Sequence, residues 1–475
     1  MDTGLTEPAD AAALKLTVIG TGYLGATHAV CMAVLGYQVL GVDVDASKIE
    51  RLAAGEVPFF EPGLPELLAK ALDSGRLRFT TSLDEAADFG DVHFLCVGTP
   101  QRAGSYAADL RHVEAAVTRL ARGLRRRALV VGKSTVPVGT AARLAEVLRA
   151  VSPAGDSVEL AWNPEFLREG FAVDDTMRPD RLVFGVSSRW AEQRLREVFA
   201  PVIGQGSPVL VTDPQTAELV KVAANGFLAT KISYINAMAE VCEASGADVH
   251  DLATALGLDE RIGNRFLRPG LGFGGGCLPK DIRAFMHRAE ELGVGQAVAF
   301  LREVDGINQR RRGRMVDLVC ELAGGDLRGV RVAALGAAFK PNSDDIRDAP
   351  ALDVASSLHQ AGARVRVFDP VAMDNARRAY PALEYGDSAL DVATGADVVV
   401  LLTEWSQFRE MDPTALRAVV AKPRIVDGRH ALDPTHWRAA GWEYRALGRP
   451  CGDPGSHSVI RTVPTRRHGS TCGDG

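Results

Sequence analysis

Hydrophobic and polar positions change their period several times along the chain, and the first change comes near residue 14. The segment LKLTVIG (14–20) is a short apolar run that ends in glycine, which is typical of a buried strand. Residues 26–37 (ATHAVCMAVLGY) then carry apolar side chains at helical spacing, and QVLGVDVD (38–45) forms a second apolar run. This order predicts a strand–helix–strand unit with parallel strands.

The alternation of apolar runs and helical stretches continues to about residue 210. Strands are predicted at FLCVGTP (94–100) and LVVGKSTVP (129–137), with helical stretches between them. Strands that alternate with helices are typical of an open, doubly wound α/β domain. We assign residues 1–213 to this domain.

From residue 214 the pattern becomes helical. Residues 214–246 place apolar side chains three and four positions apart, with Gly246 as a stop signal. Further helices follow to about residue 315, interrupted by the glycine-rich segment RPGLGFGGGCLPKD (268–281). We interpret 214–315 as a helical middle domain that connects two α/β units and can supply a dimer interface.

A second strand–helix–strand order begins near residue 330. Apolar runs at 329–340 and 363–370 flank a helical stretch, and two more runs follow at 396–405 and 424–430. Asp369 ends the second run as Asp43 does in the first unit, but after Gly336 the other glycines of a phosphate turn are missing. The predicted fold class is α/β, with two Rossmann-like doubly wound domains (the second over 316–448) joined by a long central helix and a helical middle domain. Residues 449–475, rich in Gly, Pro, Ser, Thr and Arg, are predicted to be a disordered tail.

Composition narrows the class of protein. The chain has 475 residues, 46% of them hydrophobic, and a net charge of −6, so as a whole it does not attract nucleic acid or an anionic membrane. Its apolar runs are too short to cross a bilayer, and the acidic N-terminus predicts no signal peptide. The seven cysteines are scattered without a C-x-x-C pair, which argues against a metal site or a disulfide framework and favours the reducing cytoplasm.

The turn after the first strand carries the first candidate chemistry. Gly20, Gly22 and Gly25 form G-x-G-x-x-G between a strand and a helix, so a pyrophosphate can rest on the helix N-terminus. Asp43 ends the next strand, where a carboxylate accepts hydrogen bonds from a ribose and repels a 2′-phosphate. This favours NAD over NADP, although Lys48 lies nearby in the sequence. The alternative is a glycine turn of some other α/β protein.

A glycine run precedes Cys277 in GFGGGCLPKD (272–281). Such a loop lets a substrate and a cofactor approach the sulfur, because glycine-rich loops concentrate function rather than packing. Lys280 is close enough in the sequence to lower the thiol pKa, and Asp281 can orient a lysine or a water. The usual role of a free cysteine is that of a buried filler, which fits the other six cysteines better than Cys277.

Two pairs of polar residues at i, i+4 spacing offer further candidates. Lys221 and Asn225 share one face of the long helix, where they could stabilise an oxyanion or belong to a solvated face. Glu165 and Glu169 in NPEFLREG (163–170) share a face if that segment is helical, and could act as general bases or lie on the surface. The hydroxyls of STVPVGT (134–140) end a strand at the ligand edge of the sheet or cap the next helix.

Together these segments resemble the UDP-glucose/GDP-mannose dehydrogenase family, and most of all its UDP-glucose branch. The match covers about residues 15–435 and rests on GTGYLG, EPGLPELL, VGTP, STVPVGT, NPEFLREG, KVAANGFLATKISYINAMAE, RIGNRFLRPGLGFGGGCLPKD and FKPNSDDIRDAPAL. The resemblance implies an NAD-dependent enzyme that oxidises the C6 alcohol of a nucleotide sugar to a carboxylate through a thiohemiacetal and a thioester on Cys277. It implies UDP-glucose as the substrate and a homodimer or higher homo-oligomer as the assembly.

The resemblance also implies roles for single residues. Cys277 is implied to be the nucleophile, and Asp281 to pair with a lysine and a water. Glu165 is implied to be the base for thioester hydrolysis. The other implied catalytic residues are the oxyanion stabilisers Lys221 and Asn225, and Thr135. The implied cofactor contacts are Gly20, Gly22, Tyr23, Leu24, Gly25, Asp43, Lys48, Thr99, Pro100, Thr135, Glu169, Lys280 and Arg347. The implied substrate contacts are Glu165, Phe166, Leu167, Lys221, Asn225, Phe273, Gly274, Lys340, Arg429 and, reaching into the neighbouring subunit, Arg261.

Some residues depart from the family pattern. Gly276 stands where many relatives carry serine, Val222 where tyrosine is common and Gly226 where alanine is common. After VGTP the chain reads QRAGSYAADL, where many relatives carry a shorter polar loop. The departures leave the implied chemical residues intact and bear on substrate selection. A GDP-mannose or dTDP-glucose 6-dehydrogenase remains an alternative, as does a non-catalytic dinucleotide-binding sensor.

Overall fold

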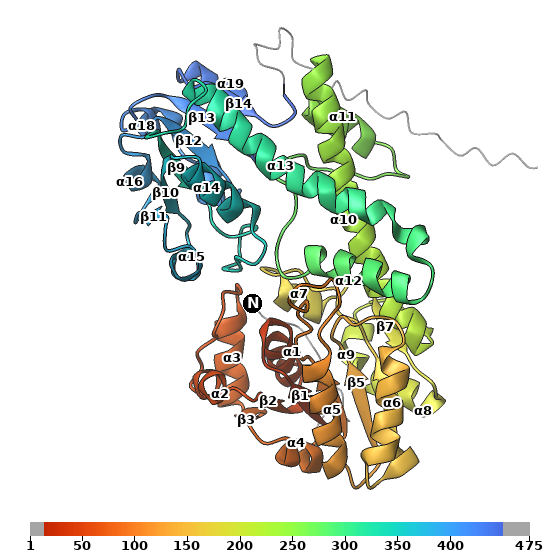
Figure 1. The fold of residues 1–475 in the computed structure, drawn as a ribbon. Helices are drawn as coiled ribbons and strands as arrows, with labels where there is room; N and C mark the ends of the chain where they lie inside the picture. Colours follow the sequence, from red (N-terminus) through yellow and green to blue (C-terminus); the bar gives the residue numbers. More distant parts are fainter. Residues whose placement is uncertain (1–13, 450–475) are drawn as a thin grey trace, which may run out of the picture.

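The computed structural model describes residues 14–449, which form two β-sheets bridged by long helices (Figure 1). The predicted disordered tail, apart from Arg449, lies outside the described residues. Within residues 14–449, no helix combines the length and apolar character that a membrane crossing requires.

The first sheet has eight strands in the order β3-β2-β1-β4-β5-β6-β7-β8. Neighbouring strands are parallel except β6 and β7, which meet at one antiparallel pair, Trp162 and Gly185. The strands are Lys15–Ile19 (β1), Gln38–Val42 (β2), Leu77–Thr80 (β3), Val92–Leu95 (β4), Ala128–Gly132 (β5), Val158–Trp162 (β6), Leu182–Gly185 (β7) and Val209–Thr212 (β8). The predicted strand–helix–strand unit is thus confirmed. Strands also lie at the two later apolar runs, but β4 and β5 end at Leu95 and Gly132, before the predicted ends at residues 100 and 137.

Helices cover both faces of this sheet, which explains why its central strands β4 and β5 are buried along their whole length. They are Tyr23–Val34 (α1), Ala46–Ala53 (α2), Leu64–Asp73 (α3), Leu83–Phe89 (α4), Arg111–Gly123 (α5), Thr140–Val151 (α6), Gly155–Ser157 (η2), Ala172–Met177 (α7), Arg189–Val198 (α8) and Ala200–Ile203 (α9).

The second sheet is wholly parallel, in the order β11-β10-β9-β12-β13-β14. This is the 3-2-1-4-5-6 order of a Rossmann fold, which the first six strands of the first sheet also follow. Its strands are Arg331–Leu335 (β9), Arg364–Phe368 (β10), Glu384–Tyr385 (β11), Val398–Leu401 (β12), Arg424–Asp427 (β13) and Glu443–Ala446 (β14). Its helices are Pro350–Gln360 (α14), Met373–Ala379 (α15), Ala389–Ala393 (α16), Ser406–Arg409 (α17), Pro413–Arg417 (α18) and Pro434–Ala439 (α19).

In the second unit, the backbone of the turn that corresponds to the phosphate turn is bonded to Asp369 of the same unit. Asp369 Oδ2 accepts hydrogen bonds from the backbone N–H groups of Ala337 (2.8 Å) and Ala338 (3.0 Å). These two residues follow Gly336, where the first unit has its glycine turn. The prediction of a Rossmann-like unit with a decayed turn is confirmed.

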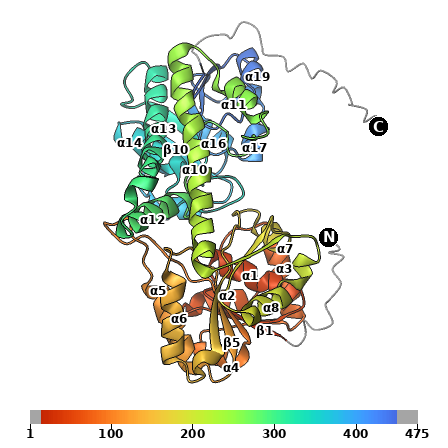
Figure 2. The same cartoon turned by 90° about the vertical axis from the view of Figure 1, so that its right-hand side faces the viewer.

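Helix α10 (Pro214–Ser245) links the two units. Asp213 caps its start by accepting from Thr216 N (2.7 Å), and Gly246 ends it with φ of 78°. The long helix and its glycine stop were both predicted. The start of α10 packs on β7 and α6, and its later turns pack on α12 and α13 (Figure 2). The other middle helices are Val249–Gly257 (α11), Leu278–Glu291 (α12), Gly295–Val298 (η3) and Phe300–Ala323 (α13).

Helix α13 corrects one predicted boundary. It continues past residue 315, where the middle domain was expected to end, to Ala323. Its last turns bury Met315, Val319 and Leu322 in the core of the second sheet, so the helix cannot stop before that core is covered.

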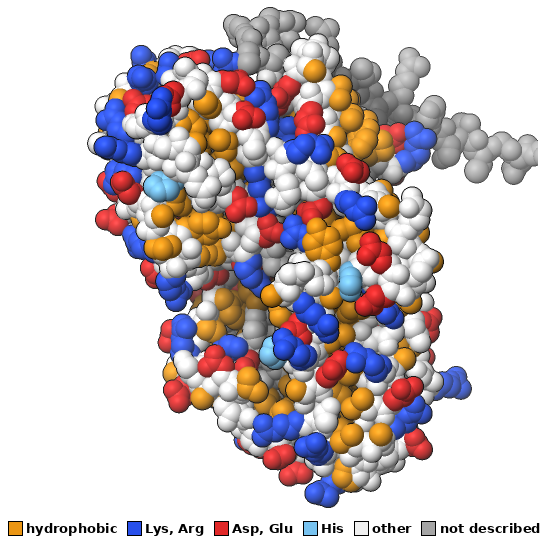
Figure 3. All heavy atoms as spheres, in the orientation of Figure 1, with side chains coloured by type: hydrophobic (Ala, Val, Ile, Leu, Met, Phe, Trp, Pro, Cys, Tyr) orange, Lys and Arg blue, Asp and Glu red, His pale blue; other side chains and the backbone are white. Residues whose placement is uncertain are grey.

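The surface is hollowed between the two α/β units (Figure 3). Residues from both units also bond directly: Phe60 N donates to Asp344 Oδ1 (3.2 Å), and Ser343 Oγ donates to Glu169 Oε2 (3.0 Å). Ligands of open α/β sheets bind outside the carboxyl ends of the strands, so a ligand site is expected near this junction.

Candidate active site

The glycine turn has the geometry that a bound pyrophosphate needs. Gly20 has φ of 91°, and a Cβ at Gly25 would lie 1.7 Å from Gly20 O, so only glycine allows α1 to approach β1 this closely. A Cβ at Gly22 would meet nothing within 4 Å, and no side chain caps the N-terminus of α1. The N–H groups at this helix end therefore face open space.

Asp43 lies beside this turn. Its carboxylate accepts from Thr21 N (2.8 Å) and from Lys48 Nζ (2.9 Å). Burial raises the pKa of Asp43, but hydrogen bonds from Lys48, Asp45 and Thr21 outweigh that effect, so its pKa lies below its usual value. The carboxylate is ionised at neutral pH, and Lys48 is engaged with it.

Tyr23 and Leu24 begin helix α1 without a polar group directed at the turn. The Tyr23 hydroxyl donates to Glu61 and accepts from Gly170 N (2.8 Å), while Leu24 packs against the core of the first sheet. Glu61 also accepts from Ala172 N (2.7 Å) at the start of α7. Glu61 belongs to EPGLPELL, but that segment does not predict these bonds, because Gly170 and Ala172 lie more than a hundred residues away in the chain.

Cys277 lies directly before helix α12, makes no side-chain bond to that helix, and is exposed as a residue. The surrounding protein nevertheless desolvates its thiol. This desolvation and the carboxylates of Glu165 and Asp281 raise the pKa of the thiol to about 12, against the lowering effect of Lys221 and Lys280. Lys280 does act to lower the thiol pKa, as its place in the sequence suggests, but desolvation and the two carboxylates outweigh it.

Lys221 and Asn225 are buried, which excludes the solvated-face interpretation. Lys221 Nζ lies 2.9 Å from Glu165 Oε1, and Asn225 Nδ2 donates to Asp281 Oδ2 (2.7 Å). Burial lowers the pKa of Lys221, but the charges of Glu165, Cys277 and Asp281 raise it above its usual value, so the side chain is an ammonium ion. Two donors of helix α10 thus lie among the charged groups around the sulfur.

Asp281 does pair with a lysine, but that lysine is Lys280 on the same helix.

Residues 163–171 are not helical. Glu165 and Glu169 therefore do not share a helix face, although their spacing would have allowed it. Asn163 explains the irregular backbone, since its side chain accepts from Lys133 Nζ (2.8 Å) and donates to Val183 O (3.0 Å).

The two glutamates face different partners. Glu165 approaches Lys221, with Phe166 and Leu167 following it: the Phe166 ring lies 5.7 Å from Lys221 Nζ, and Leu167 N donates to Glu165 Oε2 (2.6 Å). Glu169 bonds Ser343 and lies 3.4 Å from Arg347 Nη2. Burial, followed by the charge of Asp345, raises the pKa of Glu169 to about 7.

Thr135 follows β5 beside Thr99 and Pro100. Thr99 Oγ1 donates to Thr135 O (2.7 Å), which joins the ends of two neighbouring strands. The hydroxyls of 134–140 do not cap helix α6. Glu218 of α10 takes that role, because its carboxylate accepts from Gly139 N (2.7 Å) and Ala141 N (2.6 Å).

Glu218 gives the protein a pH-dependent stability. Burial raises its pKa to about 7, so the folded state holds the proton more tightly than the unfolded state. This contribution to the unfolding free energy is present at low pH and is lost as pH rises from about 4.5 to about 7. In urea unfolding, we expect Glu218→Gln to reduce the decline of the unfolding free energy between pH 5 and pH 7.5 by about 2 kcal/mol. Glu66→Gln, at an exposed position of α3, should leave this decline unchanged. A decline in E218Q equal to that of the unmodified protein would contradict the role of Glu218.

The second unit contributes Arg347 and Lys340. The charge of Cys277 affects the pKa of both side chains, so both cations lie near the sulfur. Arg347 is held by Asp345, and its guanidinium crosses Gly276, where a Cβ would lie 2.3 Å from Cζ. Gly276 therefore lets Arg347 approach the cysteine loop in this chain; a serine there requires Arg347 to move.

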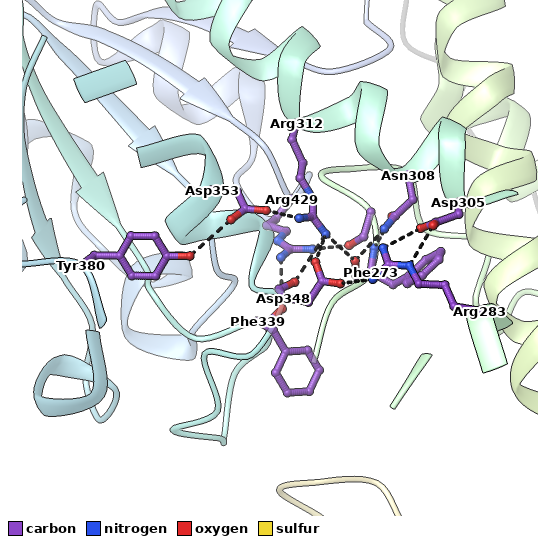
Figure 4. A network of polar contacts seen from close by, with 11 residues as sticks. Phe273, Arg283, Asp305, Asn308, Arg312, Phe339, Asp348, Asp353, Tyr380 and Arg429 are labelled. Carbon is purple, nitrogen blue, oxygen red and sulfur yellow. Dashed lines mark hydrogen bonds and ion pairs between the residues drawn. The ribbon is translucent and has the colours of Figure 1, made fainter. Parts of the chain in front are cut away.

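Arg429 links the glycine loop of the middle domain to two loops of the second unit. Its guanidinium donates to the carbonyl oxygens of Leu402 (2.8 Å), Gly272 (3.0 Å) and Phe339 (3.1 Å). It thereby orders the loop of Phe273 and Gly274 against the second unit (Figure 4). Arg261 lies elsewhere: its side chain is 88% exposed and pairs with Asp259. The described residues contain no group of three or more His, Cys, Asp or Glu side chains that could hold a metal ion.

Comparisons with known proteins cover nearly the whole described chain. Three models of the UDP-glucose/GDP-mannose dehydrogenase family match it: the NAD binding domain at 14–203, the central domain at 215–310 and the UDP binding domain at 333–434. The UDP-glucose 6-dehydrogenase of Rhizobium meliloti is 43% identical over 439 residues, which is 92% of this chain and 100% of the relative. The UDP-glucose 6-dehydrogenase of Pseudomonas aeruginosa is 42% identical over 446 residues, which is 92% of this chain and 98% of the relative. A solved UDP-glucose dehydrogenase from Pyrobaculum islandicum has a TM-score of 0.86 at 40% identity, covering 94% of this chain and 100% of its own.

Proposed function

Because the chain belongs to the UDP-glucose/GDP-mannose dehydrogenase family, we propose that it oxidises UDP-glucose to UDP-glucuronate with two NAD⁺ per sugar. The observation that carries the proposal is the exposed thiol of Cys277 among the charges of Lys221, Glu165 and Asp281. A dinucleotide sensor would not need a nucleophile with this surrounding. The N-terminal unit is an NAD-binding domain, and the open helix end at Gly22 and the ionised Asp43 fit a pyrophosphate and a ribose.

NAD⁺ held by the glycine turn and Asp43 would supply the hydride acceptor for each of the two oxidations at C6. Between them, the Cys277 thiol adds to the aldehyde carbon and gives a thiohemiacetal. The second oxidation turns this adduct into a thioester, and water then cleaves the C–S bond to release the carboxylate and the thiol. The sum is RCH₂OH + 2 NAD⁺ + H₂O → RCOO⁻ + 2 NADH + 3 H⁺. Lys221 and Asn225 stabilise the oxygen on C6, and Glu165 takes a proton from the attacking water.

A substrate panel tests the proposal. Purified protein is given NAD⁺ with UDP-glucose, dTDP-glucose or GDP-mannose, and NADH is followed by absorbance. We expect two NADH per UDP-glucose and the highest kcat/KM with that sugar nucleotide. No NADH with any of the three would reject the enzyme assignment, and a preference for GDP-mannose or dTDP-glucose would reject UDP-glucose as the substrate.

The cofactor preference depends on Asp43. Its charge lies where a ribose binds, and it would repel the 2′-phosphate of NADP⁺. For Asp43→Asn we expect the ratio of kcat/KM for NAD⁺ to that for NADP⁺ to fall at least about tenfold, as a loss of about 1.4 kcal/mol in discrimination requires. Lys48, freed from its ion pair, should add to the gain in NADP⁺ use. The matched variant Asp45→Asn, which keeps the Asp43 carboxylate, should leave the ratio within about twofold.

We also propose that the chain works as a homodimer in the cytoplasm. Along α10, Phe227, Tyr234 and Val241 recur every seven residues and are 67%, 50% and 56% exposed, which leaves an apolar face on a long helix. A second copy can cover that face and bring Arg261 toward the neighbouring site. The cytoplasmic location is supported by the unpaired state of the five described cysteines, and fractionation of the cells that make the protein tests it.

The dimer has a direct test. We expect Phe227→Glu to shift the mass in light scattering from two chains to one at micromolar concentration, because a charge in an apolar interface is not compensated. Leu210→Glu, at another exposed apolar position on β8, is the control and should keep the mass of the unmodified protein. A dimeric F227E would show that this face of α10 is not the interface.

A further inference from the structure

Asp348 joins two helices through one carboxylate. Its Oδ1 accepts from Arg312 Nη2 of α13 (2.8 Å), and its Oδ2 accepts from Arg283 Nη1 of α12 (3.3 Å) (Figure 4). Helix α12 begins directly after Cys277. The carboxylate therefore connects the helix that carries the sulfur to the loop of the second unit that carries Arg347.

The backbone of Asp348 also touches the cysteine loop. A Cβ at Gly274 would lie 2.2 Å from Asp348 O, and Gly275 N donates to Arg347 O (2.9 Å). Asp348 has φ of 46°, in the left-handed region that aspartate and asparagine tolerate better than most residues. The carbonyl thus reaches Gly274 because the residue adopts this conformation and because position 274 lacks a side chain.

Helix α13 holds the other end of the same loop. Asn308 Oδ1 accepts from Phe273 N (2.8 Å), and Asn308 Nδ2 donates to Phe273 O (2.9 Å). Arg312 Nη2 adds a longer bond to Phe273 O (3.4 Å). The loop from Phe273 to Cys277 is therefore fixed by α13 at its start and by the Arg347–Asp348 backbone in its middle.

The need to neutralise the charges of Arg283 and Arg312 does not by itself explain why Asp348 lies between them. Arg283 has a carboxylate of its own in Asp305 (2.9 Å), and Arg312 has one in Asp353. Removal of the Asp348 charge would leave each arginine paired. What Asp348 adds is the bridge, because it bonds both arginines, whereas Asp305 bonds Arg283 and Asp353 bonds Arg312.

We infer that Asp348 is a positioning residue that fixes the sulfur of Cys277 relative to the bound substrate and Arg347. It acts through α12 and the glycine loop and touches neither substrate nor cofactor. The inference rests on the proposed function, because the second oxidation requires the sulfur to capture the aldehyde. A sulfur misplaced by about 1 Å slows that capture strongly, whereas the first hydride transfer does not use it.

The variant Asp348→Asn tests this inference. Asparagine keeps the left-handed backbone and its single amide oxygen cannot bridge two arginines as a carboxylate does. With UDP-glucose and NAD⁺ we expect kcat to fall about tenfold or more, KM for UDP-glucose to change less than about twofold, and an aldehyde trap to collect product that the unmodified protein does not release. NADH formed per sugar consumed should fall below two in the presence of the trap.

Asp353→Asn is the matched control, since it removes a carboxylate from Arg312 but breaks no bridge to α12. It should keep two NADH per sugar and release no aldehyde, whatever it does to the melting temperature. Trapped aldehyde from D353N equal to that from D348N would show a merely structural effect. Full kcat with two NADH per sugar in D348N would overturn the inference.

A second readout separates this inference from the proposed function. Iodoacetamide labelling of Cys277, followed by peptide mass spectrometry, needs no turnover. We expect the labelling rate in D348N to differ at least about threefold from the unmodified protein and from D353N. If the unmodified protein makes no NADH, the proposed function fails while the labelling comparison still decides whether Asp348 sets the position of the sulfur; equal rates in all three proteins would then reject it.

Discussion

Replacing Cys277 by alanine is expected to end uronate formation, with a fall in kcat for the complete reaction of at least about 10³-fold. Without the sulfur no thiohemiacetal forms. The second oxidation then lacks the adduct from which the hydride is removed. Uronate from UDP-glucose, measured by chromatography, checks the result. Cys320→Ala, on α13, is the matched cysteine control and should retain activity. Full uronate production by C277A would reject the role of this residue.

Serine at 277 separates the steps further. A hydroxyl is a weaker nucleophile and a poorer leaving group than a thiol, so Cys277→Ser should slow turnover and let a covalent intermediate accumulate. Intact-protein mass spectrometry after mixing with UDP-glucose and NAD⁺ should detect the added mass of the sugar nucleotide. An unmodified protein mass at every time point, with slow turnover, would contradict this account of the variant.

Lys221→Met is expected to lower kcat by about 10²–10³-fold, because a buried ammonium that stabilises a developing oxyanion has no substitute in methionine. Glu165 would also lose its ion-pair partner at a buried position, so the unfolding free energy should fall by about 3–5 kcal/mol. Steady-state kinetics and urea unfolding measure the two effects separately. Lys70→Met, at an exposed position of α3, should change neither. A K221M protein with kcat within about threefold of the unmodified enzyme would exclude oxyanion stabilisation by this lysine.

The parts of the fold that follow from short segments were predictable. Gly20, Gly22 and Gly25 between an apolar run and a helical stretch predict a turn whose geometry depends on those few residues. Gly246 likewise marks the end of α10, because a left-handed residue without Cβ ends a helix wherever it occurs. Four strands of the second sheet (β9, β10, β12 and β13) were predicted because they repeat the same local order, whereas the edge strands β11 and β14 were not.

The parts of the site that depend on distant contacts were not predictable. Glu165 and Glu169 looked like a helical pair, but the side chain of Asn163 is bonded to Lys133 and Val183 and the backbone turns elsewhere. Lys280, near in the sequence, was predicted to act to lower the pKa of the Cys277 thiol, and it does act in that direction, but it does not decide the net pKa. The pKa of the thiol is raised by desolvation and by Glu165, more than a hundred residues away.

The carboxylates that organise the site were missed for the same reason. Glu218 caps a helix 77 residues earlier in the chain, and Asp348 bonds an arginine 65 residues earlier. Glu218 belongs to none of the quoted motifs, and Asp348 belongs to FKPNSDDIRDAPAL, but that motif does not show which arginines Asp348 bonds. Only the folded chain identifies which acids have partners.

Helix α10 has a consequence for how the enzyme should respond to its own concentration. Asn225 and Phe227 are two positions apart on one continuous helix, so the proposed oxyanion donor and the proposed subunit contact belong to one rigid element. If the proposed dimer forms through this face, separation of its subunits should disturb the proposed oxyanion donors without any change in the sequence around the thiol. Specific activity should then decline on dilution below the dissociation constant of the proposed dimer and recover when the sample is concentrated again.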